Sequence, residues 1–336
     1  SKTDWDSFET SWDFQKHPIL THKENSTTIE KAFNNWSKFT HKQFYQLKAN
    51  EEELNRIFID IYGLEDELTP EVEDKDITIS KVVEEKSEED KKNSYTVDRK
   101  EAIQSFISYG VGCIFGRYSL DEEGLAYAGG DFDLSKYKTF LADKDNVIPV
   151  VSNPYFENDI VSRFVDFVRI TFGEENLSEN LQYIAESIGM RANEVPRETL
   201  RRYFINNFFK DHVQTYKKRP IYWMFTSGRR KAFNALIYMH RYDRTTLAKI
   251  RTDYLHVLQS RLEGEKQSLS TMVKDVENTR EKRQLEKQIS DIEKDLQEIK
   301  EYDEKLHHMA DMMIDIDLDD GVKVNYKKFE GLVQKI

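Results

Sequence analysis

The stretch RPIYWMFTSGRRKAFNALIYM, residues 219–239, decides the fold that we expect for the middle of the chain. Ile221 to Phe225 is an apolar, aromatic-rich run typical of a strand, and residues 233–239 form a second run of this kind. Ser227 to Lys231 lies between them, and its glycine among polar residues is typical of a turn. The sequence therefore predicts a β-hairpin with a cationic tip.

The hairpin lies inside a basic segment that runs from Arg197 to Arg251. This segment holds fourteen lysines and arginines against three acidic residues, a net charge of +11 in a chain whose net charge is −12. A basic island in an acidic protein is typical of a polyanion-binding site, because its cations displace counterions from phosphates. The alternative is an ordinary hairpin with a solvated basic face.

Nine cations of the segment are our candidates for contact with DNA. An arginine can donate two hydrogen bonds to O6 and N7 of guanine, whereas lysines more often contact phosphates. Aromatic and amide side chains alternate with these charges, among them Tyr222, Trp223 and Asn234. The candidates lie before, on and after the turn: Lys217, Lys218, Arg219, Arg229, Arg230, Lys231, Arg241, Arg244 and Arg251.

The composition indicates a strongly polar chain of 336 residues, long enough for two domains. It has no apolar run of about 18 residues, so we expect no membrane span. Cys113 is the only cysteine, which excludes a disulfide framework, fits the cytoplasm and predicts a buried thiol. The first residue is serine rather than methionine, and we expect a piece of a longer protein.

Helical spacing organises most of the remaining chain. An arm and a helix ending at Gly63 are expected in residues 1–64, and a mixed α/β recognition domain in residues 65–244. Residues 245–336 read as a helical spacer, similar to a coiled coil, followed by a tail. The apolar phase of the spacer slips between Val276 and Leu285, so the tract is either one helix with a stutter or a hairpin turning near Asn278. Arg197, Arg201 and Lys210 are expected on the outer face of a helix beginning near Pro196.

Three short motifs resemble known binding or catalytic sites, but each departs from the pattern of that site. Gly110, Gly112 and Gly116 follow a helical pattern, so we favour close helix packing over a nucleotide loop. Residues 153–156, Asn-Pro-Tyr-Phe, resemble part of the loop that holds the target base in amino-methyltransferases, but a helix start is the simpler interpretation. The aspartates of residues 315–320 lack the terminal glutamate of an EF-hand.

Several blocks resemble, in order, the C-terminal region of the PglX family of adenine-specific DNA methyltransferases from bacteriophage-exclusion (BREX) systems. The resemblance covers nearly the whole chain. The blocks are TSWDF (10–14), HP (17–18), LNRIFIDIYGL (54–64), YGVG (109–112), FGRYSL (115–120), RPIYW (219–223), ALIYMHRY (235–242), RTDYLH (251–256) and LDDGVKVNY (318–326).

The resemblance implies a role in phage defence, where the parent enzyme methylates N6 of an adenine in a short asymmetric site. The catalytic and S-adenosylmethionine motifs of that enzyme are missing here, so we expect the DNA target-recognition portion, with double-stranded DNA as its partner and no cofactor or metal of its own. The alternative is a protein-interaction module that docks other BREX subunits or a DNA-mimic inhibitor. The expected fold is α+β and mostly helical, with a small β-rich recognition element and a long C-terminal helical pair or coiled coil.

Overall fold

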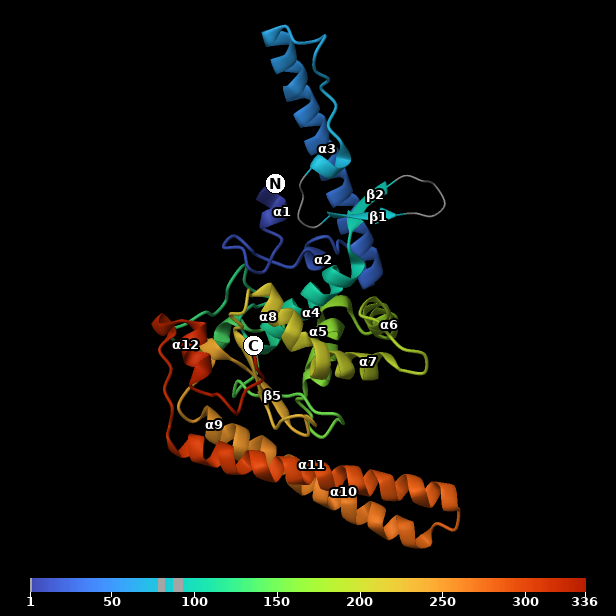
Figure 1. Ribbon diagram of the computed structural model, residues 1–336, viewed down its shortest axis with the longest axis vertical. Helices are drawn as coiled ribbons and strands as arrows, with labels where there is room; N and C mark the ends of the chain where they lie inside the picture. The colour runs from blue at the N-terminus through green and yellow to red at the C-terminus, as the bar shows by residue number, and fades with distance from the viewer. Residues whose placement is uncertain (1, 78–81, 87–92) are drawn as a thin grey trace. The chain divides into compact units, whose positions relative to one another are not determined.

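The computed structural model describes residues 2–77, 82–86 and 93–336, and it is mostly helical (Figure 1). The chain divides into two compact units. Unit 1 consists of residues 1–109 and 168–188, and unit 2 consists of residues 110–167 and 189–336. No described helix combines the length and the apolar character needed to cross a lipid bilayer.

Unit 1 is built around the long helix α3, Ile29–Tyr62. The Thr28 side chain accepts a hydrogen bond from the Lys31 amide at its start, and Gly63 ends it in the left-handed conformation, φ 63°, as predicted. Asn180 fixes the helix start by accepting a 2.7 Å hydrogen bond from the Ile29 amide. The remaining elements of this unit are α1 (Lys2–Trp5), α2 (Pro18–Thr21), η1 (Asp74–Asp76), the antiparallel pair β1 (Val82–Lys86) and β2 (Asn93–Val97), and α6 (Leu177–Ser187).

Two helices pass from one unit to the other. The first is α4, Arg99–Phe115, which Asp98 begins by accepting a hydrogen bond from the Glu101 amide. The second is α5, Ile160–Phe172, where Asp159 accepts from the Ser162 amide. Both aspartates satisfy amides that the helix itself leaves unpaired.

The predicted hairpin forms the sheet of unit 2. Within the described residues, this sheet has the order β3-β5-β4 and is antiparallel. Its strands are β3 (Ile148–Pro149), β4 (Tyr222–Thr226) and β5 (Asn234–Tyr238), and Tyr222 pairs with Tyr238. Both hairpin strands are buried along almost their whole length, so only the turn is exposed.

Just before the hairpin, an α-helix is interrupted by a π-helical segment. α7 (Pro196–Tyr203) continues through the π-helical η3 (Phe204–Phe208) into α8 (Phe209–Thr215). His212 of α8 is buried, and its Nε2 accepts hydrogen bonds of 3.0 Å from the amides of Ile221 and Tyr222. Burial lowers the pKa of His212 to about 3, which keeps the imidazole neutral and able to accept.

The C-terminal helical tract is a pair of helices rather than one. α10 (His256–Asp275) and α11 (Thr279–Asp311) lie side by side (Figure 1). Asn278 starts α11 by accepting from the amides of Arg280 and Glu281, so the hairpin alternative near Asn278 is confirmed. The other elements are η2 (Leu134–Lys136), η4 (Met239–Arg241), α9 (Thr246–Lys249), the π-helical η5 (Ile250–Leu255), η6 (Leu318–Asp320) and α12 (Val322–Lys327).

Candidate nucleic-acid interface

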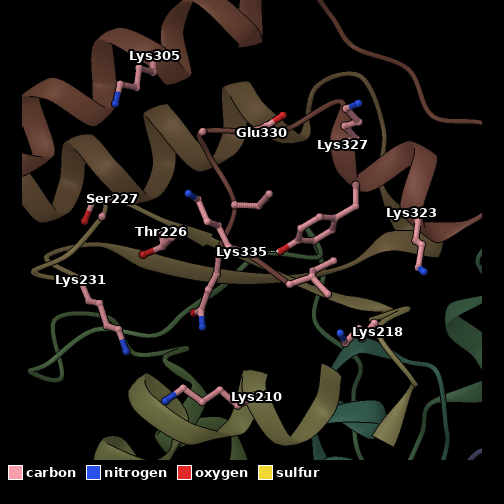
Figure 2. Close-up of a pocket in the computed structure, with 16 residues that line it drawn as sticks. Lys210, Lys218, Thr226, Ser227, Lys231, Lys305, Lys323, Lys327, Glu330 and Lys335 are labelled. Carbon is pink, nitrogen blue, oxygen red and sulfur yellow. Dashed lines mark hydrogen bonds between the residues drawn. The ribbon is translucent and has the colours of Figure 1, made fainter. Parts of the chain in front are cut away.

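A groove of about 1100 Å³ in unit 2 is lined by lysines; we call it the lysine groove (Figure 2). Lys305 of α11 and Lys210 of α8 lie on opposite sides of it. Among the lining residues that the structure describes, one side chain is acidic, that of Glu330. The seven lysines that line it are Lys210, Lys218, Lys231, Lys305, Lys323, Lys327 and Lys335.

The C-terminal tail helps to form the groove because it follows the free edge of β4. The Thr226 amide donates to the Leu332 carbonyl at 2.9 Å, and the Gln334 amide donates to the Met224 carbonyl at 2.8 Å. The buried hydroxyl of Tyr302 also donates to the Leu332 carbonyl, at 3.0 Å. Burial raises the pKa of Tyr302, so the phenol stays protonated as a donor.

The lysines of the groove keep their charge available for a ligand. In the described part of the chain, none of the seven has a carboxylate within salt-bridge distance. Lys231 is the most enclosed: its Nζ donates to the Ile205 carbonyl at 2.9 Å and to Asn206 Oδ1 at 3.0 Å. Burial and the positive charge of Lys210 lower the pKa of Lys231. Positive charge therefore converges here, and no salt bridge among the described residues neutralises these lysines.

Three of the predicted arginines are in ion pairs with the C-terminal segment instead. Arg230 Nε lies 2.6 Å from Asp295, Arg244 Nη2 lies 2.6 Å from Asp315, and Arg251 Nε lies 2.8 Å from Asp303. Their guanidinium groups position elements of unit 2 against one another.

Arg241 is also engaged within the protein. Its guanidinium lies 3.8 Å from the centre of the Phe132 ring and donates to the carbonyls of Phe115 and Lys144. Burial lowers the pKa of Arg241. This side chain packs the loop after α4 against the end of β5.

The remaining candidates are free. Lys217, Lys218, Arg219 and Arg229 are exposed, and among the residues that the structure describes no carboxylate pairs with them. The nine candidates thus divide into two lysines that line the groove, Lys218 and Lys231, three free exposed cations outside it, and four arginines bound to carboxylates or carbonyls of the chain itself.

One expectation about a neighbouring residue is wrong, and three neighbouring side chains are closed to bases. Tyr222, Trp223 and Asn234 are buried in the sheet, where apolar packing and backbone hydrogen bonds occupy them. Arg201 is not on an outer face. It donates to the fully buried Asp159 at 2.6 Å and to the Val151 carbonyl at 2.8 Å.

The glycines of α4 serve packing, as expected. A Cβ on Gly110 would lie 2.8 Å from the Phe164 ring, and one on Gly112 would clash with the Tyr118 ring. These rings leave no space for a cofactor beside the glycines. Cys113, which follows Gly112 in the sequence, is buried as predicted.

The other two motifs also have structural roles. Residues 153–156 precede α5 without forming its first turn, so the expected helix start is wrong; Tyr155 there donates to Glu265 at 2.7 Å. In the aspartate loop, Asp315 pairs with Arg244 and Asp317 accepts from the Asp319 amide. Among the described residues, no group of acidic, histidine and cysteine side chains is arranged to hold a metal ion.

Sequence reasoning missed Lys305 and the tail lysines of the groove. A signal was present, because the acidic character ends at Gly321: the last fifteen residues hold four lysines and one glutamate. The fold brings this second basic stretch to the first one, which sequence distance alone conceals.

Known proteins provide an independent comparison. No family model matches the chain. It is 49% identical, over 98% of its length, to the adenine-specific methyltransferase PglX of Lacticaseibacillus casei (strain Zhang). It is 41% identical, over all of its length, to the adenine-specific methyltransferase BrxX of Escherichia coli O9:H4 (strain HS). The chain spans 27% and 28% of these two relatives, so it corresponds to a part of such proteins.

Proposed function

We propose that this chain is the DNA target-recognition portion of an adenine-specific methyltransferase of BREX type. Support for adenine as the methylated base comes from the names of the two relatives, which match over nearly all of this chain. In this proposal the methyl donor, S-adenosylmethionine, and the catalytic residues belong to the rest of the longer protein. The helical pair α10–α11 acts as a coiled-coil-like spacer, and double-stranded DNA is the partner.

The observation that carries the proposal is the separation of free from paired cations in unit 2. Charge that contacts phosphate must be exposed and not already neutralised. Lys217, Arg219 and Arg229 meet this requirement outside the groove, and the exposed lysines of the groove meet it within. Free arginines supply the forked donors that read guanine edges, and lysines supply phosphate contacts.

Selection from a random duplex library tests target recognition directly. The chain is expected to enrich one short asymmetric site that contains an adenine. Lys217→Gln/Arg219→Gln/Arg229→Gln is expected to lose this enrichment while keeping its circular dichroism spectrum. Recovery of no common sequence by the unmodified chain would rule out target recognition by this portion alone.

A second function, protein docking, is favoured by one observation in unit 1. The second half of α3 exposes apolar side chains at the helical spacing i, i+3, i+4 and i+7: Leu54, Ile57, Phe58 and Ile61 are 45–67% exposed. Residues 51–76 around them carry eleven acidic and two basic side chains. The acidic side chains repel DNA. The apolar stripe among them suits a protein surface that has an apolar centre and a basic rim.

The docking function predicts an association that survives nuclease treatment. Phe58→Glu/Ile61→Glu would abolish copurification of another BREX subunit, and Asp60→Asn, on the same stretch of helix, would preserve it. Loss of copurification on nuclease treatment would assign the association to shared DNA instead.

A further inference from the structure

The lysine groove differs in chemistry from the other free cations of unit 2, because its described lining holds lysines and no arginine. We propose that the groove binds the phosphate groups of a single nucleic-acid strand by charge alone, without reading its bases. The nucleic-acid class of the ligand rests on the proposed function. The mode of binding rests on the groove itself.

The lining residues favour phosphate over bases. Base edges are read by arginine, asparagine and glutamine, whose donors and acceptors match them in pairs. The described lining includes neither arginine nor asparagine, and Gln334 is its single side-chain amide. Lysine ammonium groups are compact point charges that accept a phosphate from many directions. The groove therefore suits a backbone of any sequence.

The size of the groove favours one strand. Its volume of about 1100 Å³ is slightly above the range for sites that enclose small ligands, roughly 300–1,000 Å³. A duplex is far larger, since its major groove alone is about 12 Å wide. Lys210 on α8 and Lys305 on α11 lie on opposite sides of the groove, so both can approach the phosphates of a strand that lies in it (Figure 2).

The electrostatics give the groove a reason to take up an anion. Lys231 is partly enclosed, and the charge of Lys210 acts on it. Lys323 and Lys327 add two charges from α12, and Lys335 adds one from the tail. Glu330 is the one carboxylate among the described lining residues, and it forms no salt bridge with these lysines, so the ammonium groups repel one another. A row of phosphates removes that repulsion while releasing counterions.

Fluorescence anisotropy with labelled single strands tests the proposal. The probes are oligothymidine and oligoadenosine of equal length, with inorganic polyphosphate as a competitor. Lys210→Gln/Lys323→Gln/Lys335→Gln removes three exposed lysines of the groove. Lys138→Gln/Lys282→Gln/Lys287→Gln removes the same charge at exposed positions of unit 2 outside it.

The groove variant is expected to lose about tenfold or more in affinity for both strands equally. The slope of log K against log salt is negative, and its magnitude is expected to decrease by about 0.7 for each lost lysine that contacts a phosphate. The control variant is expected to bind as the unmodified chain does. Equal binding by the groove and control variants would overturn the proposal, and so would a loss confined to one base composition.

Two further outcomes separate the groove from the proposed function. If the duplex library yields no site but the groove variant still loses strand binding, target recognition fails and the groove assignment stands. If polyphosphate binds in the groove and neither strand does, the ligand is a free polyanion and the assignment to a strand is overturned.

Discussion

Arg230 donates a hydrogen bond from its Nε to Asp295 at 2.6 Å, which joins the exposed turn of the hairpin to helix α11. Glu298, one turn further along α11, accepts from the Ser227 hydroxyl at 2.6 Å and from the amides of Arg230 and Ala232 at 2.7 and 3.1 Å. The turn between β4 and β5 is therefore held by carboxylates. Its shape depends more on Glu298, which satisfies backbone amides, than on the Arg230 side chain.

Glu298→Ala is expected to lower the free energy of unfolding by about 1–3 kcal/mol, because it leaves turn amides without their acceptor. Arg230→Ala is expected to cost less, about 0.2–1 kcal/mol, since its ion pair is partly solvated. Urea unfolding followed by circular dichroism measures both. Glu293→Ala, on an exposed face of the same helix, is the control. Equal stability of the Glu298 and Glu293 variants would contradict this account of the turn.

The buried pair of Arg201 and Asp159 predicts a larger effect. Arg201→Leu leaves the Asp159 carboxylate buried without its partner, and we expect a loss of about 3–5 kcal/mol. Arg201→Leu/Asp159→Asn is expected to recover part of that loss, since asparagine keeps an acceptor for the Ser162 amide. Thermal unfolding compares them with Arg197→Leu, an exposed position on the same helix. A double variant no more stable than Arg201→Leu would show that unpaired charge is not the cause.

Asp143 predicts a pH dependence of stability. Burial and the neighbouring carboxyl group of Asp145 raise the pKa of Asp143 to about 7, while the guanidinium groups of Arg241 and Arg163 act weakly in the opposite direction. Between about pH 4, near the ordinary value for aspartate, and pH 7, the folded state holds a proton that the unfolded chain has lost. Stability from this group is therefore greatest at low pH and declines as the pH rises, by at most about 1.4 kcal/mol per pH unit.

Asp143→Asn is expected to remove this decline. Urea unfolding of the variant and the unmodified chain at several pH values from 4.5 to 7.5, the window set by that pKa of about 7, measures the difference. The variant should gain relative stability as the pH increases. A difference in the free energy of unfolding that stays constant across this range would show that Asp143 does not titrate there.

Local signals allowed much of the fold to be predicted. Gly63 ends α3, and the glycine-containing turn joins β4 to β5, both through contacts within a few residues. The fates of the cations could not be predicted in the same way. Arg230 and Asp295 are 65 residues apart, and the groove joins α8 to a tail more than a hundred residues later. Charge density identified the region, but only tertiary packing separates structural arginines from free cations.

The division of the predicted cations is tested most directly by the salt dependence of duplex binding. Lys217→Gln/Arg219→Gln/Arg229→Gln removes free cations, and Arg230→Gln/Arg244→Gln/Arg251→Gln removes the same formal charge from paired ones. For the first variant, we expect the magnitude of the negative slope of log K against log salt to decrease by about 0.9 for each lost phosphate contact. For the second, measured where circular dichroism shows it folded, we expect a slope close to that of the unmodified chain. An equal fall in both variants, or a fall in the second alone, would contradict the account.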